Sequence, residues 1–171
     1  MTTDTTHQTP KGFEFYTQRN LLFYDAFVLG FNNRFVWRCP TRDIEATFAR
    51  LAMTDHCDIG IGTGYFLKKL NAHQPFSSLH LVDASAEAVG WVRDLFPDTA
   101  VTSVCTDVSK GIPAHDGKVR SISLNYLLHC MDGPLSNKEP VFASLKAIAP
   151  AGTPVFGATI VNDDKYQTWL S

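Results

Sequence analysis

Apolar and polar positions fall into two alternating patterns from residue 41 onward. Short apolar runs such as Leu79-His80-Leu81-Val82 alternate with stretches that begin at helix-capping residues, such as Ser85 and the Ser136-Asn137-Lys138-Glu139 capping box. Strands are expected at 56–59, 79–82, 100–105, 119–125 and 154–161, and helices at 41–53, 64–72, 85–95, 136–149 and 163–170. This alternation predicts an α/β fold with a doubly wound, mostly parallel sheet.

Aromatic residues crowd the segment before residue 41. Nine of them lie in the 25 positions from 13 to 37, and four are spaced by four residues, which places them on one helix face: Phe23, Phe27, Phe31 and Phe35. Two interpretations stay open for residues 13–40. The segment is either a helix packed on the sheet edge or a helical lid over a substrate pocket, with Tyr16 and Tyr24 contacting the substrate.

A glycine-rich turn follows the first expected strand. Asp58 is followed by glycines at every second position, Gly60, Gly62 and Gly64, and an expected helix starts directly afterwards. Such a turn leaves room for a ligand against bare main chain, although a tight turn without a ligand is the plainer alternative. The nicotinamide-dinucleotide fingerprint needs a third glycine or alanine three residues after a Gly-x-Gly pair. That position holds Tyr65 or Leu67, so a dinucleotide site is disfavoured.

Polar residues recur where the expected strands end. Asp58, Asp83, Asp107 and Asn125 all fall at the carboxyl ends of strands, where open α/β sheets bind their ligands. The motif Asp58-x-Gly60-x-Gly62-x-Gly64 resembles the first motif of the class I S-adenosylmethionine-dependent methyltransferases. The upstream residues are similar to those of quinone-biosynthesis C-methyltransferases: Tyr24-Asp25, Leu29-Gly30, Arg34 and Trp37-Arg38. The resemblance implies a Rossmann-like fold and S-adenosylmethionine as cofactor.

The resemblance also assigns expected roles to individual residues. The cofactor-binding set is Asp58, Gly60, Gly62, Gly64, Asp83, Ala84, Asp107, Val108 and Asn125. Asp83 is expected to accept hydrogen bonds from the ribose hydroxyls, and Asp107 to contact the adenine amino group. His129 is a candidate general base with Tyr126 beside it, but a packed structural histidine is an equal alternative. His56, inside a strand, is interpreted as structural.

Composition narrows the class of protein. The chain has 171 residues and a net charge of −2, without clustered basic residues, so a nucleic-acid partner is not expected. It has no apolar run of about 20 residues, so no membrane span is expected. The four cysteines form no Cys-x-x-Cys pair and the six histidines are scattered, which predicts reduced thiols, no metal site and a cytoplasmic location. Residues 1–12 are expected to be a disordered tail, and 13–171 a single domain.

The resemblance implies methyl transfer to a small molecule, and we expect an aromatic or polyketide-like product of secondary metabolism. O-, N- and C-methylation stay open, as do two alternatives, a cofactor-dependent cyclisation and a non-catalytic partner subunit. Family members usually end with two antiparallel strands that are not found here after 154–161. That strand, which looks buried on both faces, is then expected to form a sheet edge that pairs with a second copy or a partner subunit.

Overall fold

The structure is a computed structural model that describes residues 39–115 and 117–161. The expected tail at 1–12 lies outside the described residues. So do residues 13–38 of the expected lid at 13–40, with Tyr16 and Tyr24, and the helix at 163–170.

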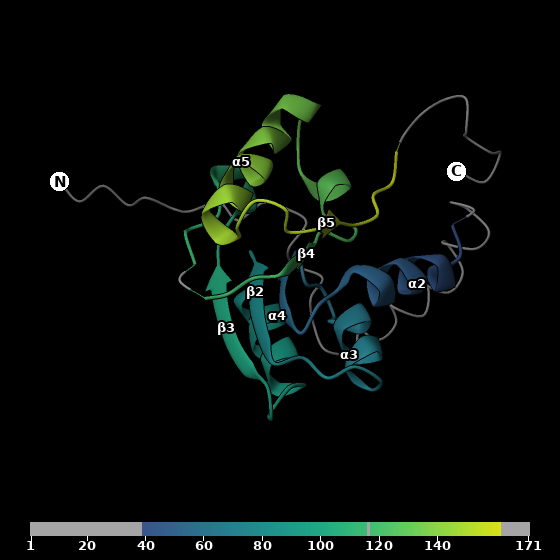
Figure 1. The fold of residues 1–171 in the computed structure, drawn as a ribbon. Coiled ribbons are helices and arrows are strands. Elements are labelled where there is room, and N and C mark those ends of the chain that lie inside the picture. Colours follow the sequence, from purple (N-terminus) through teal and green to yellow (C-terminus); the bar gives the residue numbers. More distant parts are fainter. Residues whose placement is uncertain (1–38, 116, 162–171) are drawn as a thin grey trace.

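The centre of the molecule is a sheet of five parallel strands (Figure 1). They are β1 (Asp55–Ile59), β2 (Ser78–Asp83), β3 (Ala100–Cys105), β4 (Ser121–Ser123) and β5 (Val155–Phe156). Their order in the sheet is β3-β2-β1-β4-β5. The expected Rossmann-like, mostly parallel architecture is therefore confirmed.

Helices cover both faces of this sheet. One face packs against α2 (Thr41–Leu51), α3 (Tyr65–Asn71) and α4 (Ala86–Asp94), and the other against α5 (Glu139–Ile148). In Figure 1, α5 lies at the upper left of the sheet and α2 at its right. Phe48 of α2, Leu67 of α3 and Val92 of α4 are fully buried in the first layer, and Val141 of α5 in the second.

The strand order reverses beside β1. The chain runs outward from β1 to β2 and β3 on one side, and then returns to build β4 and β5 on the other. Connections leaving the carboxyl ends of β1 and β4 therefore diverge, and this divergence opens a crevice at the point where doubly wound sheets bind ligands. The glycine turn after β1 and Asn125 after β4 flank this point.

The helix starts follow the sequence in one case and depart from it in another. Ser85 caps α4, because its side chain accepts a hydrogen bond from the Ala88 N–H at 3.1 Å, as expected. The expected capping box at Ser136 is wrong. Residues Leu135–Lys138 form a 3-10 turn and α5 starts at Glu139, with no side-chain cap. Pro140 explains the later start, since its fixed φ suits a first helical turn and it has no N–H to be capped.

The fifth strand is shorter than the sequence suggests. Only Val155–Phe156 has strand geometry, although the backbone stays beside β4, with the Tyr126 N–H donating to the Ala158 carbonyl at 2.7 Å. Val155 is 44% exposed and Phe156 is 9% exposed, so the expectation that both faces are buried is wrong. Gly157 allows this close approach: a Cβ built there would lie 2.0 Å from the Leu124 carbonyl oxygen.

Candidate cofactor site

The turn after β1 has the geometry of a ligand cradle. Gly62 has a φ of +52°, a conformation that side-chain-bearing residues rarely adopt, and a Cβ built there would meet no atom within 4 Å. Gly60 and Gly64 also have positive φ, of +75° and +71°, and packing restricts them as well, because their Cβ atoms would lie 2.9 Å from Leu127 and 3.0 Å from Val92. The middle glycine therefore borders open space, while the outer two bring α4 and the segment after β4 close to the turn.

The Asp83 carboxylate lies directly beside this turn. It accepts a hydrogen bond from the Ser85 N–H at 2.8 Å, and the backbone N–H groups of Ile61, Gly62 and Ala84 also donate to it. Burial raises the pKa of Asp83, although these backbone hydrogen bonds oppose the shift. The structure thus brings together Asp83, Ala84 and the glycine turn, which the sequence placed at separate strand ends.

Asn125 approaches the same crevice from β4. Its side chain is 9% exposed, and its Nδ2 has no hydrogen-bond partner among the described residues. A buried amide donor without a partner is costly, so a site that supplies an acceptor is expected. The next residue, Tyr126, has a φ of +57° and is the non-glycine residue in the described chain with this left-handed geometry. Backbone strain of this kind is concentrated at functional sites.

Asp58 lies within β1, beneath the glycine turn. It is 6% exposed and accepts a hydrogen bond from the Ser123 hydroxyl of β4. Burial raises its pKa to about 7, while the Ser123 hydrogen bond lowers it and the charge of Asp83 raises it further. Two carboxyl groups, Asp58 and Asp83, therefore lie at this end of the sheet, and the charge of one disfavours ionisation of the other.

His129 and Tyr126 lie together beyond β4. The Tyr126 ring stacks on Phe66 at the start of α3, with centroids 6.5 Å apart, and meets the His129 ring edge-on at 6.1 Å. The Ile160 N–H donates to His129 Nδ1 at 3.4 Å, and the Thr159 hydroxyl lies 3.3 Å from the same atom. Burial, and then the charge of Lys138, lower the pKa of His129. His129 is therefore neutral at pH 7, as a general base must be.

Asp107 and Val108 are placed differently from the rest of the expected set. Asp107 is exposed and caps a short 3-10 turn, accepting from the Ser109 N–H at 3.0 Å and forming an ion pair with Lys110 at 3.3 Å. The pKa of Asp107 is lowered, mainly by the hydrogen bond from the Ser109 hydroxyl. The Val108 side chain is buried in the layer beneath α5. Their contact with adenine stays a prediction.

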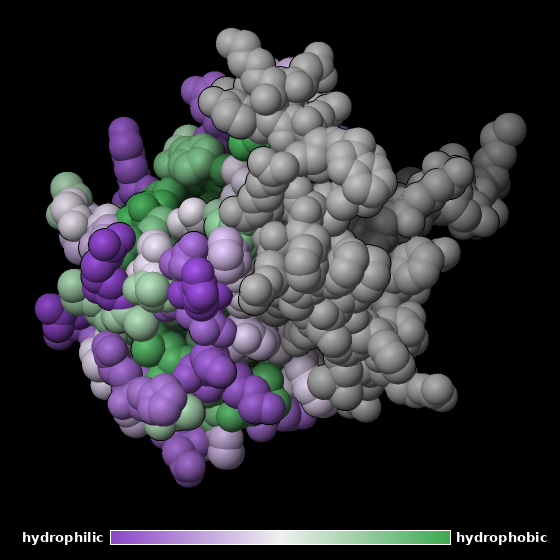
Figure 2. All heavy atoms as spheres, turned by 90° about the vertical axis from the view of Figure 1, so that its right-hand side faces the viewer, coloured by the Kyte–Doolittle hydropathy of each residue, from purple (hydrophilic) through white to green (hydrophobic). Residues whose placement is uncertain are grey.

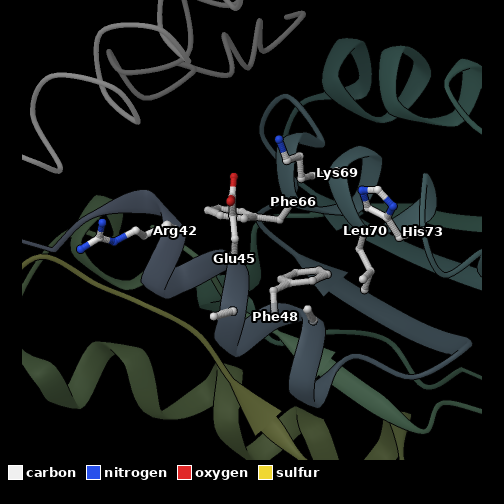
Figure 3. A pocket seen from close by; sticks show the side chains of 9 residues that line it. Arg42, Glu45, Phe48, Phe66, Lys69, Leu70 and His73 are labelled. Carbon is white, nitrogen blue, oxygen red and sulfur yellow. The ribbon is translucent and has the colours of Figure 1, made fainter.

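A separate hollow of about 370 Å³ lies between α2 and α3 (Figure 3). Phe48, Phe66 and Leu70 give it apolar walls, and Glu45 and Lys69 stand at its rim. Figure 2 views the molecule from this side and shows polar and apolar residues mixed on the described surface. The hollow includes neither the glycine turn, Asp83 nor Asn125, so it is distinct from the crevice at the strand ends.

Sequence reasoning missed the serines of β4. Ser121 and Ser123 are fully buried and bond to His56 and Asp58 across the strands. The signal was polar residues at every second position, Ser121, Ser123 and Asn125, in a strand that is otherwise apolar. His56, which we expected to be structural, is 1% exposed and both of its ring nitrogens are bonded.

The arrangement fits S-adenosylmethionine. The open space over Gly62 suits a ligand lying on the main chain, and the Asp83 carboxylate is a strong acceptor beside it. The unpartnered Asn125 Nδ2 adds a donor from the facing strand. In the part of the chain that the structure describes, no helix has the length and apolar character that a bilayer crossing requires.

Comparisons with known proteins agree with this geometry. Residues 57–152 match the family model described as a methyltransferase domain. The chain is 34% identical over 155 residues to the physcion biosynthesis cluster O-methyltransferase of Aspergillus chevalieri, covering 90% of this chain and 69% of that protein.

Solved methyltransferases share the fold at low sequence identity. An amino pentose methyltransferase from Micromonospora echinaspora, solved with its cofactor bound, has a TM-score of 0.59 at 14% identity and covers 91% of this chain and 59% of its own. The N-methyltransferase NodS from Bradyrhizobium japonicum, solved with S-adenosylhomocysteine, has a TM-score of 0.53 at 16% identity, covering 77% and 67%. From the family match, the relatives and the glycine-turn geometry together, the chain belongs to the class I S-adenosylmethionine-dependent methyltransferases and uses S-adenosylmethionine as its cofactor.

Proposed function

We propose that this methyltransferase acts on a hydroxyl oxygen of a small aromatic or polyketide-like metabolite. The observation that carries the proposal is the meeting of the glycine turn, Asp83 and the unpartnered Asn125 amide at the strand-order reversal. Oxygen as the acceptor atom is supported by the names of relatives such as the physcion biosynthesis cluster O-methyltransferase. Bound there, S-adenosylmethionine supplies a methyl group already activated as a sulfonium.

The protein's own task is then mainly to position groups. Asp83 would hold the ribose hydroxyls, Asn125 would donate to the cofactor from β4, and the Gly60–Gly64 turn would keep the cofactor close to the main chain. The Tyr126 ring, which lies beyond β4 and stacks on the buried Phe66, offers an apolar surface suited to an aromatic acceptor. Tyr16 and Tyr24 stay candidates for the same acceptor.

His129 is proposed as the base that removes the proton from the acceptor hydroxyl. Its lowered pKa keeps it neutral at pH 7, and its Nδ1 makes two long contacts with described residues, of 3.3 and 3.4 Å. Such contacts are weak, so releasing Nδ1 to accept a proton costs little. His129 would take the proton from the acceptor oxygen and later pass it to water. As that oxygen bonds to the methyl carbon, the carbon–sulfur bond of the sulfonium would break, its electron pair would stay on sulfur, and S-adenosylhomocysteine would leave.

The test is a product analysis with isotope-labelled S-adenosylmethionine and a panel of phenols and polyketide-derived enols. We expect an acceptor whose mass rises by one methylene and whose label is found on oxygen. Label on carbon or nitrogen contradicts the acceptor atom. An unmethylated, cyclised product supports the cyclase alternative, and turnover only after addition of a second protein supports the partner-subunit alternative.

Two further proposals concern the setting of the enzyme. The described cysteines are free, and Cys39, Cys105 and Cys130 are exposed, which supports a cytoplasmic location where thiols stay reduced. Pairing with a second copy or a partner along β5 is supported by the exposed Val155 on the outermost described strand. Ultracentrifugation over a wide concentration range tests the second proposal, and a monomer at every concentration contradicts a homodimer.

A further inference from the structure

Four polar side chains line up across β1 and β4. The parallel register pairs His56 with Ser121 and Asp58 with Ser123, and residues two apart on a strand share one face. This is the face covered by α2 and α3. The His56 ring lies among three aromatic rings, with centroids 5.3 to 5.9 Å away: those of Phe48, Phe76 and Phe156. A polar strip therefore runs through an otherwise apolar layer.

Hydrogen bonds join this strip from end to end. The Met53 N–H donates to Ser121 Oγ at 2.8 Å. Ser121 Oγ lies 2.7 Å from His56 Nδ1, and His56 Nε2 lies 2.8 Å from Ser123 Oγ. The Ser123 hydroxyl then donates to the Asp58 carboxylate. The chain of bonds thus ends on the carboxylate that lies two residues before the first glycine of the turn.

The two ends of this chain fix its direction. A backbone N–H can only donate, and an ionised carboxylate can only accept. Because Ser123 spends its one hydrogen on Asp58, His56 must donate to Ser123 from Nε2. A neutral imidazole then accepts at Nδ1, where Ser121 donates. Burial lowers the pKa of His56 to about 3 and outweighs a hydrogen bond with the Ser121 backbone, which raises it. The ring is therefore neutral, as this pattern requires.

The reversed chain is less favourable. If Asp58 were protonated, it would donate to Ser123, Ser123 would donate to His56 Nε2, and His56 Nδ1–H would donate to Ser121. Ser121 would then accept from both His56 and the Met53 N–H. The Ser121 hydroxyl hydrogen would then lose its acceptor, and the structure gives Ser121 no third partner among residues 39–115 and 117–161. Ser121 is fully buried, so a stranded donor is costly there. The chain therefore favours the ionised form of Asp58.

We propose that His56 is a positioning residue, which acts with Ser121 and Ser123 through a one-way hydrogen-bond chain to favour the ionised form of Asp58 and to orient it under the cofactor turn. Asp58 and Asp83 then present two negative charges at the cofactor site. S-adenosylmethionine carries a sulfonium charge that S-adenosylhomocysteine lacks. The chain thus favours binding of the cofactor over its product by charge. This inference rests on the cofactor assignment and not on the acceptor.

The groups that face Asp58 define the expected pH dependence. On β1 they are His56, which is neutral, and Cys57, whose pKa burial raises. From β2 the charge of Asp83 raises the pKa of Asp58, and β4 contributes the Ser123 hydroxyl. Because the pKa of Asp58 is about 7, tight binding of S-adenosylmethionine should be present above pH 7 and decline below it. Loss of the Ser123 donor should move this decline to higher pH.

The first experiment reads the tautomer of His56 in the intact protein. Long-range nitrogen–proton NMR of the uniformly labelled chain distinguishes Nε2–H from Nδ1–H imidazole, and a His56→Gln sample assigns the signal. We expect a neutral Nε2–H ring that does not titrate between pH 5 and 8. An Nδ1–H ring, or a ring that gains a proton in this range, overturns the proposal. This readout needs no cofactor, so it stands even if the cofactor assignment fails.

The second experiment compares the affinities of S-adenosylmethionine and S-adenosylhomocysteine by calorimetry from pH 6 to pH 9. Ser123→Ala should weaken S-adenosylmethionine roughly tenfold at pH 7.5, weaken S-adenosylhomocysteine less, and shift the pH decline upward. Ser78→Ala is the matched control: Ser78 bonds to Asp55 at the opposite end of the strands, at 2.8 Å. If Ser123→Ala weakens the affinity for both ligands equally and does not shift its pH dependence, Ser123 is merely structural and the proposal is overturned.

Two substitutions of His56 test the direction of the hydrogen-bond chain and keep a polar side chain at this position. Glutamine places its amide nitrogen near the position of Nε2 and keeps a donor for Ser123, whereas asparagine places it near Nδ1. His56→Gln should retain the preference for S-adenosylmethionine, and His56→Asn should lose it. Melting curves measured beside the affinities identify variants that fail to fold, for which the NMR result decides. The same preference in both folded variants contradicts the one-way chain.

Discussion

Asp58→Asn should make the fold less sensitive to pH while weakening the cofactor. Burial raises the pKa of Asp58 from 3.8 to about 7. Between these values the unfolded chain has released the proton and the folded chain still holds it, so the free energy of unfolding falls as pH rises. The slope is about 1.4 kcal/mol per pH unit. Between pH 5 and pH 7, the wild-type chain should lose roughly 2–3 kcal/mol through this residue.

Asparagine has no charge to bury, so this loss should be absent from the variant. Its side-chain oxygen can still accept from Ser123, which keeps the local bond. Buried His56 and His80, with pKa values lowered to about 3 and about 4 by burial, stabilise the fold less as pH falls below 6.5. His80 lies outside the hydrogen-bond chain of Asp58, so its contribution cancels in the difference between wild type and variant. His56 shares that chain, so its contribution cancels as far as asparagine keeps the bond from Ser123.

Urea unfolding at pH 5, 6, 7 and 8 measures the effect directly. The free energy of unfolding of Asp58→Asn, relative to wild type, should increase by roughly 2–3 kcal/mol from pH 5 to pH 7 and level off above pH 7. Asp98→Asn is the control, since it removes one exposed carboxylate. A difference that stays constant with pH, or that matches the control, would refute the claim that Asp58 is a buried carboxylate that must ionise in the fold.

Four other changes test the site and its frame. Asp83→Ala should weaken S-adenosylmethionine by roughly ten- to a hundredfold in calorimetry, because a charge-assisted bond is worth about 1.5–3 kcal/mol. Gly62→Val should abolish cofactor binding by filling the open space over the turn, with a smaller effect on the melting temperature. His129→Gln should lower kcat. The wild-type rate should fall on the acid side below pH 6.5, because the pKa of His129 is lowered, and this fall should be absent from the variant. Gly157→Ala should cost about 3 kcal/mol or more in urea unfolding, because its Cβ would overlap the Leu124 carbonyl.

Each of these has a contrary outcome. An affinity within twofold of wild type after Asp83→Ala would leave Asp83 as a turn residue only. Binding that survives Gly62→Val would mean that the ligand lies elsewhere. An unchanged acid limb in His129→Gln would assign the base to another group, and a Gly157→Ala chain of normal stability would show that the contact with β4 relaxes freely.

The sheet and the cofactor turn could be predicted because their signals are local. The Asp58–Gly64 motif fixes a strand, a turn and a helix start within ten residues, and the apolar run at 79–82 ends at Asp83 by itself. Once strands are parallel, their carboxyl ends must meet on one edge. The joining of Asp83 to the glycine turn therefore followed from topology alone.

What sequence reasoning missed depends on which strands are neighbours. Ser121 and His56 are 65 residues apart, and only the register of β4 against β1 brings them together. The exposed face of Val155 could not be read from its apolar neighbours, because the burial of an edge strand depends on what covers it. The capping-box pattern at Ser136 was overruled by Pro140, whose fixed φ suits a first helical turn.

The central position of β1 also has a consequence for how the chain folds. The strands β1 to β3 follow one another in sequence and can pair as soon as they are made, but the other flank of β1 has to wait for Ser121–Ser123. Until then, His56 and Asp58 lack the hydroxyls that satisfy them. A half-built sheet with a polar, unpaired flank is poorly stable, and closing a loop of this length is slow. Docking of β4 should therefore be the late step of folding, and the one at which the cofactor turn becomes rigid.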